Sequence, residues 1–166
     1  SFKAIFLDRD GVINKDFGYV FKIEDFVFTK GALSAMKYLI DLNYVLFIIT
    51  NQSGIGRGYF TENDFLKLDS YIKKILKKHG IIIKETFYCP HHPEAKIEKY
   101  KQECSCRKPK TGMLDRAFSK YEIDKSSSFL IGDKLTDIEA GKSAKIKSLL
   151  FNTDDLDSFI RSSIIS

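Results

Sequence analysis

Short apolar runs alternate along this chain with longer stretches in which apolar residues recur at helical spacing. Consecutive apolar, β-branched or aromatic residues predict five strands, at 2–7, 44–49, 81–88, 129–131 and 148–151. Apolar residues that recur every three or four positions predict four helices, at 31–42, 61–80, 111–121 and 136–144. Thr61 and Thr111 are expected to cap the helices that begin there, and residues 50–54 are expected to form a polar turn. One more short helix is expected after residue 151. Apart from Lys3, the first two strands are apolar throughout, which is typical of strands buried on both faces of a sheet.

This alternation indicates a fold class. Because a helical pattern separates each predicted strand from the next, we expect an α/β fold with a doubly wound parallel sheet and a Rossmann-type core. Residues 1–166 are expected to form a single domain, since a composition of 43% hydrophobic and 30% charged residues is ordinary for a globular chain of this length. The polar segment at about 89–106 has no periodic pattern of apolar residues, and it is too long for a structureless connection. We expect a crosslink to hold it.

The first strand leads directly into Asp8-Arg9-Asp10-Gly11. With the two-residue period of a strand, Asp8 and Asp10 project to the same side and Arg9 points away. Two crowded carboxylates repel each other unless a bound cation or a shared proton offsets their charge. The alternative is an ordinary polar turn, because Asp and Gly are also common turn residues.

Three other polar clusters follow predicted strands or lie beside them. They are Thr50-Asn51, Arg107-Lys108, and Asp133 with Asp137. Since the carboxyl ends of parallel strands meet at one edge of the sheet, these groups are expected to lie together. Carboxylates, a hydroxyl and fixed cations at one place can bind a phosphoryl group with a divalent metal.

The chain is basic, with a formal net charge of +5 and a pI near 9.0. This balance fits nucleic acid, an anionic surface or a small anionic substrate. Much of the charge is assigned to the solvated face of one helix, which carries Lys73, Lys74, Lys77 and Lys78. No run approaches the ~18 apolar residues of a membrane span, and the chain opens on a strand rather than a signal peptide, so we expect a cytoplasmic protein.

All three cysteines lie in the segment without periodicity. An odd number of cysteines and no sign of export argue against a disulfide framework. Cys89-x-His91 and Cys104-x-Cys106 instead form two ligand pairs, a set suited to structural Zn²⁺. Three core thiols beside a histidine are the alternative, and His92 could in principle replace His91.

The order of these motifs resembles the four signature motifs of the haloacid dehalogenase superfamily of phosphatases. The matching motifs are Asp8-x-Asp10-Gly11-Val12, Thr50-Asn51, Lys108 and Gly132-Asp133-x-x-x-Asp137. Longer strings at 5–11, 50–55, 89–93 and 106–109 narrow the resemblance to its heptose bisphosphate phosphatases, in the histidinol-phosphatase-like subgroup without a large cap domain. Val12 stands where that family often has threonine.

The resemblance implies a mechanism. Asp8 would attack phosphorus to form an aspartyl phosphate, and Asp10 would act as general acid and then general base. Thr50 and Lys108 would bind the phosphoryl oxygens. Mg²⁺ would be held by Asp8, the backbone carbonyl of Asp10, and Asp133, with Asp137 behind them.

The resemblance also implies a substrate, a small sugar bisphosphate that loses its 7-phosphate in heptose and lipopolysaccharide biosynthesis. Arg107, with its planar fork, is assigned to the phosphate that is not removed. Further substrate contacts are expected from Asp16, Gly18, Tyr19, Asn51, Gln52, Ser53 and Lys134. For Asp16 and Tyr19 an ordinary loop is the alternative. We expect a monomer that binds neither nucleic acid nor membranes.

Three other functions compete. A histidinol-phosphate phosphatase would share the motifs and the zinc loop, but its relatives tend to have a shorter connection than the one between His91 and Cys104. A phosphatase acting on nucleic-acid 3′ ends could use the same catalytic core. A basic zinc-bearing nucleic-acid-binding module would have no use for Asp8, Asp10 and Asp133 at one strand edge, since carboxylates repel phosphate.

Overall fold

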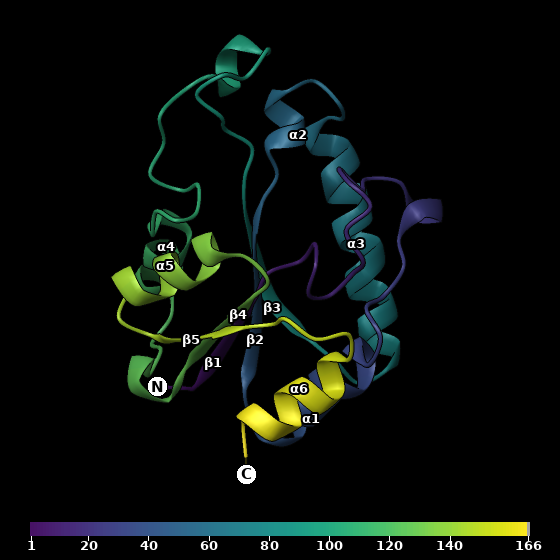
Figure 1. The fold of residues 1–166 in the computed structure, drawn as a ribbon, viewed down its shortest axis with the longest axis vertical. Helices are drawn as coiled ribbons and strands as arrows, with labels where there is room; N and C mark the ends of the chain where they lie inside the picture. The colour runs from purple at the N-terminus through teal and green to yellow at the C-terminus, as the bar shows by residue number, and fades with distance from the viewer. Residues whose placement is uncertain (166) are drawn as a thin grey trace.

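A parallel five-stranded sheet forms the centre of the molecule in the computed structural model, which describes residues 1–165 (Figure 1). The strands stand in the order β3-β2-β1-β4-β5, with β1 in the middle. Their bounds are β1 Ala4–Leu7, β2 Val45–Asn51, β3 Ile83–Cys89, β4 Phe129–Gly132 and β5 Lys147–Leu150. Every neighbouring pair is parallel, which confirms the predicted fold class.

Helices cover both faces of this sheet. Their bounds are α1 Ala32–Asp41, α2 Ser53–Gly56, α3 Glu62–Lys78, α4 Gly112–Lys120, α5 Leu135–Ser143 and α6 Leu156–Ser163, with short 3-10 turns at Ile23–Asp25, Glu98–Tyr100 and Lys125–Ser127. Figure 1 shows α4 and α5 on one side of the sheet and α1, α3 and α6 on the other. None of the helices within residues 1–165 is long and apolar enough to cross a membrane.

The side chains of β1 show why its sequence is apolar throughout. Ile5 and Leu7 join a core cluster with residues of α1, α3 and α6, whereas Ala4 and Phe6 join a second cluster with residues of α4 and α5. All four side chains have no exposed surface. A strand buried on both faces cannot alternate between apolar and polar residues, which confirms that β1 is buried on both faces as its sequence predicts.

Of the two predicted N-terminal helix caps, one is present in the structure and the other is not. Thr61 caps α3 as predicted, because its hydroxyl accepts from Asp64 N at 3.0 Å while the Asp64 carboxylate accepts from Thr61 N at 2.9 Å. The predicted cap at Thr111 is wrong. Its hydroxyl donates to the Asp115 carboxylate at 2.8 Å and makes no capping bond to the backbone of α4.

The predicted polar turn after the second strand is also wrong in part. β2 continues through Thr50 and Asn51, which pair with Tyr88 and Cys89 of β3. The next residue, Gln52, donates its backbone N–H to Cys89 O at 2.8 Å, and the helical turn α2 follows directly. Pairing with β3 thus outweighs the turn preference of these polar residues.

The segment at 89–106 extends from the end of β3 away from the sheet (Figure 1). It is anchored by Ala95 and Tyr100, which are buried against Ile55 of α2 and Phe65 of α3 in a third apolar cluster. The segment is therefore packed onto the fold as well as crosslinked within itself.

Substituting Thr61→Ala is expected to destabilise the protein by about 1 kcal/mol, because the backbone N–H of Asp64 loses the hydroxyl that accepts its hydrogen bond. Thermal or urea unfolding measures this. Thr111→Ala is the matched control and should cost clearly less, since no backbone group depends on its hydroxyl. Equal losses in the two variants would contradict this account of the caps.

Candidate active site and metal sites

A buried lysine joins two carboxylates at the carboxyl end of β1. Lys108 Nζ lies 3.0 Å from Asp8 Oδ1, donates to Asp137 Oδ1, and donates to the carbonyl of Ile49 at 3.0 Å. All three charged side chains are less than a tenth exposed. Lys108 therefore fixes the position of Asp8.

One cation does not offset two buried carboxylates. Burial raises the pKa of Asp8 to about 7, against the opposing attraction of Lys108 and with added repulsion from Asp137. Burial alone would lower the pKa of Lys108, but the charges of Asp8 and Asp137 raise it above its ordinary value. The cluster has an excess of negative charge that a divalent cation would balance.

Asp133 supplies a free oxygen beside this cluster. Carboxylate oxygens of Asp8, Asp133 and Asp137 lie within 4.8 Å of one another, and burial raises the pKa of Asp133. Asp133 Oδ1 is buried without a hydrogen-bond partner, whereas Asp137 already accepts from Lys108 and from Lys134 N. The oxygens left for a hard cation are thus those of Asp8 and Asp133, which fits Mg²⁺.

Gly11 makes this approach of Asp133 possible. Its φ is +89°, and a Cβ at this position would collide with the Asp133 carboxylate. The glycine that follows the two aspartates is needed for the shape of the metal site as well as for the turn.

Asp10 has different partners from Asp8. Its Oδ1 accepts from Arg9 Nη2 at 2.8 Å and from Asn14 Nδ2 at 3.0 Å, and its Oδ2 accepts from Gln52 Nε2 at 2.9 Å. The prediction that Arg9 points away from the two aspartates is therefore wrong: its long side chain turns back and meets Asp10. The sequence gives no signal for this, since strand periodicity describes only the first bond of a side chain.

A cavity of about 480 Å³ opens above these groups. Nearly all the residues predicted to act on the substrate line it: Asp8, Asp10, Asp16, Gly18, Tyr19, Asn51, Gln52, Ser53, Arg107, Lys108 and Lys134. Thr50 is buried beneath it and accepts from Gln52 Nε2 at 2.9 Å. The structure also places Arg57 in the wall, which sequence reasoning missed because Gly56-Arg57-Gly58 has the composition of a surface turn.

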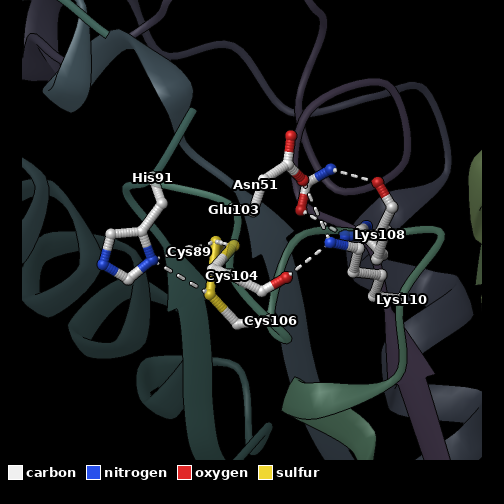
Figure 2. The surroundings of a disulfide bond; sticks show 8 residues. All are labelled: Asn51, Cys89, His91, Glu103, Cys104, Cys106, Lys108 and Lys110. Atoms are coloured by element: carbon white, nitrogen blue, oxygen red, sulfur yellow. Dashed lines mark hydrogen bonds and ion pairs between the residues drawn. A yellow bond between two sulfur atoms is a disulfide. The ribbon is translucent and has the colours of Figure 1, made fainter. Parts of the chain in front are cut away.

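The side chain of Asn51 forms hydrogen bonds with the backbone of Lys108. Its Oδ1 accepts from Lys108 N at 3.0 Å and its Nδ2 donates to Lys108 O at 3.2 Å (Figure 2). These two bonds hold the backbone of Lys108 at the end of β2. A contact between Asn51 and substrate remains a prediction.

Two arginines leave donors free near the mouth of the cavity. Arg107 Nη1 and Arg57 Nε are buried without partners, while Arg57 Nη2 lies 3.2 Å from His92 Nε2. Burial and then the charges of Arg107 and Arg57 lower the pKa of His92. The unused guanidinium donors can bind an anion.

Three cysteines and one histidine meet at the base of the 89–106 segment (Figure 2). One ligand atom from each of Cys89, His91, Cys104 and Cys106 lies within 4.8 Å of the others. His92 is excluded, because its Nδ1 accepts from Glu94 N and its Nε2 faces Arg57. The predicted ligand set thus converges with His91 as its histidine.

The structure joins Cys89 and Cys106 as a disulfide. The sequence argues against a disulfide framework and favours a metal site at these cysteines, so this single bridge departs from that expectation. The remaining groups face the same point: Cys104 Sγ lies 3.5 Å from Cys89 Sγ, and His91 Nδ1 lies 3.3 Å from Cys106 Sγ. A disulfide would not need them, whereas all four side chains together could hold a metal ion.

A Rossmann-type sheet with these motifs at its carboxyl edge is typical of the haloacid dehalogenase class of phosphatases. The HAD-hydrolase-like family model matches residues 105–158, which include Lys108, Asp133 and Asp137.

Two relatives and one solved structure narrow this class. The chain is 50% identical over 146 residues to a D-glycero-beta-D-manno-heptose-1,7-bisphosphate 7-phosphatase of Pasteurella multocida, covering 88% of this chain and 79% of that one. It is 46% identical to a Campylobacter jejuni enzyme named for the alpha anomer, covering 92% and 84%. The D,D-heptose 1,7-bisphosphate phosphatase from B. bronchiseptica, complexed with magnesium and phosphate, superposes with a TM-score of 0.81 at 28% identity, covering 97% of this chain and 86% of that one. The chain belongs to the family of heptose 1,7-bisphosphate 7-phosphatases.

Asp8→Asn is expected to stabilise the magnesium-free protein at pH 8 and to do so clearly less at pH 5. The folded-state pKa of Asp8, about 7, lies above its ordinary 3.8, so the stability that its protonated form gives is complete below pH 3.8 and is lost as pH rises from there to 7. Melting temperatures at both pH values measure the difference, at about 2–4 °C for each kcal/mol.

Asp41→Asn is the control for this experiment, because Asp41 forms an exposed pair with Lys37. A loss of stability in Asp8→Asn at pH 8 would contradict the excess of buried negative charge.

Proposed function

We propose that this chain is a Mg²⁺-dependent phosphatase that removes the 7-phosphate of D-glycero-D-manno-heptose 1,7-bisphosphate. The observation that carries the proposal is a pair of carboxylates that line one cavity and have different partners. Asp8 accepts a hydrogen bond from Lys108, whereas Asp10 accepts hydrogen bonds from three other side chains. The printed names of the relatives support the choice of substrate.

The first half of the reaction forms a covalent intermediate. A carboxylate oxygen of Asp8 attacks phosphorus, the bond from phosphorus to the sugar oxygen breaks, and protonated Asp10 gives its proton to that oxygen. Lys108 and Thr50 bind the phosphoryl oxygens on which charge gathers. Lys108 is already held in place by Ile49 O and Asp137, so little reorganisation is needed.

The second half restores the enzyme. Ionised Asp10 takes a proton from water, whose oxygen attacks phosphorus and releases phosphate from Asp8. Asp10 is then protonated again for the next turnover. Asp8, Asp133 and the backbone carbonyl of Asp10 would hold Mg²⁺, which when bound supplies positive charge to the phosphoryl oxygens.

The second phosphate of the substrate gives the arginines a role. We assign Arg107 and Arg57 to the 1-phosphate, because each has a buried donor without a protein partner. Asp16, Gly18, Tyr19, Asn51, Gln52, Ser53 and Lys134 are assigned to the sugar and its phosphates. Histidinol phosphate carries one phosphate only and would leave these guanidinium donors unused, which disfavours that alternative.

We also propose that Zn²⁺ occupies the Cys89, His91, Cys104 and Cys106 set, and that residues 1–166 act as a single domain and a monomer in the cytoplasm. The zinc assignment is supported by the four converging donors. Arg107 and Lys108 follow Cys106 directly, so the zinc site would restrict both cations at the mouth of the cavity. The metal would thereby serve the active site without touching substrate.

Purified protein with Mg²⁺ should release one phosphate from heptose 1,7-bisphosphate and turn over histidinol phosphate at least about 100-fold less efficiently, because the second anion site adds charge-assisted hydrogen bonds. Phosphate release from the alpha and beta anomers and from histidinol phosphate, assayed side by side, measures this. Asp8→Asn should abolish turnover with the fold intact by circular dichroism. Retained turnover, or a preference for histidinol phosphate, would contradict the proposal.

Cys106→Ala is expected to lower zinc content and activity together. Elemental analysis should find about one zinc per chain in the native protein. A thiol assay on the protein unfolded without reductant should find three free thiols. Ser105→Ala, between two of the ligands, is the control and should keep both zinc and activity. A native protein with no zinc and a single free thiol would show that the disulfide is the working crosslink.

A further inference from the structure

Arg9 is the largest of the fully buried side chains, with 1% of its surface exposed. Burying a guanidinium costs several kcal/mol unless it is well paired. Its environment pairs it only in part, because Nε and Nη1 have no hydrogen-bond partner. A cation retained at such a cost, between the two catalytic aspartates, needs an explanation.

A single nitrogen of Arg9 makes both of its polar contacts. Nη2 donates to Asp10 Oδ1 at 2.8 Å and to the carbonyl of Val20 at 2.7 Å. The guanidinium lies over the ring of Phe65, 5.7 Å from its centroid, which limits its tilt. One atom therefore connects the general acid with the backbone of a distant loop.

That loop, residues 16–21, lines the cavity through Asp16, Gly18 and Tyr19. Its side chains pack on the fold, since Val20 is buried in the main core cluster, Tyr19 meets the ring of Tyr59, and Phe21 stacks on Phe60. Among the hydrogen bonds of residues 1–165, the bond from Arg9 to Val20 is the one that ties the backbone of this loop to the rest of the fold. The backbone at Tyr19 has a φ of 54°, an unfavourable conformation for a tyrosine, and the Arg9 bond fixes the backbone at the next residue.

We propose that Arg9 is a positioning residue that fixes the direction of the Asp10 carboxylate and fastens the 16–21 loop to the same point. The proton donor and the substrate-facing loop are then aligned by one group. This inference rests on the proposed function, because it gives Asp10 the proton transfers. Asn14 and Gln52 hold Asp10 as well, so loss of Arg9 misaligns the carboxylate without releasing it.

Two variants test this proposal, Arg9→Met, which removes the donor, and Arg9→Lys, which keeps a charge but has no planar fork. Arg161→Met is the control, since Arg161 pairs with Asp157 on the exposed face of α6. The readout is the first-turnover rate with heptose bisphosphate, whose sugar oxygen must be protonated, relative to p-nitrophenyl phosphate, whose leaving group needs no proton.

In Arg9→Met the ratio of the sugar rate to the aryl rate is expected to fall on the order of 10- to 100-fold, within the range that general acid catalysis contributes. Arg9→Lys should restore part of the ratio, and Arg161→Met should leave it unchanged. A purely structural role would lower both rates together, and an unchanged ratio in Arg9→Met overturns the proposal. If that variant does not fold, a native ratio in Arg9→Lys overturns it.

A second measurement does not depend on catalysis. Trypsin cleavage after Lys22, next to the loop, should be at least severalfold faster in Arg9→Met than in the native protein or in Arg161→Met. Equal cleavage rates overturn the fastening of the loop. A native protein that hydrolyses neither substrate refutes the proposed phosphatase instead, and the trypsin comparison still decides whether Arg9 holds the loop.

Discussion

The buried ion pair between Lys108 and Asp8, with Asp137 behind it, is the interaction on which the rest of the site depends. Lys108 reaches the carboxyl end of β1 from a segment a hundred residues later in the chain. Its own backbone is clamped by Asn51 at the end of β2, and Asp137 reaches it from α5. Three separate parts of the chain therefore have to be folded before Asp8 is correctly placed.

Much of this arrangement could be predicted, because the four motifs sit where a parallel sheet must bring them together. Apolar strands buried on both faces and the polar groups at their ends gave the fold class, the cavity and most of its lining. What escaped prediction is the direction of long side chains. Arg9 turns back toward Asp10, Arg57 enters the cavity wall from a glycine-rich turn, and Thr111 bonds to a side chain instead of capping. The periodicity of a strand or helix predicts the direction of the Cα–Cβ bond. It does not predict the position of the terminal atoms of a long, flexible side chain.

The two carboxylates that follow β1 show how neighbours two residues apart acquire different chemistry. Asp8 is desolvated and faces a lysine, so it suits metal binding and attack on phosphorus. Asp10 lies among amide and guanidinium donors that fix its orientation. The difference comes from the elements packed around them, since the local sequence treats the two aspartates alike.

The order of the strands also separates the part of the molecule that forms the cavity from the part that contributes no residue to it. The central strands β2, β1 and β4 lead into Thr50, Asp8 and Asp133, and the edge strand β3 ends at a cysteine of the crosslinked segment. The opposite edge, β5, and the helix α6 that follows it contribute no group to the cavity. Figure 1 places α6 at the far end of the molecule from the 89–106 segment. The exposed face of α6 is thus a natural site for a fluorophore or another label, because cargo joined there stays clear of the cavity.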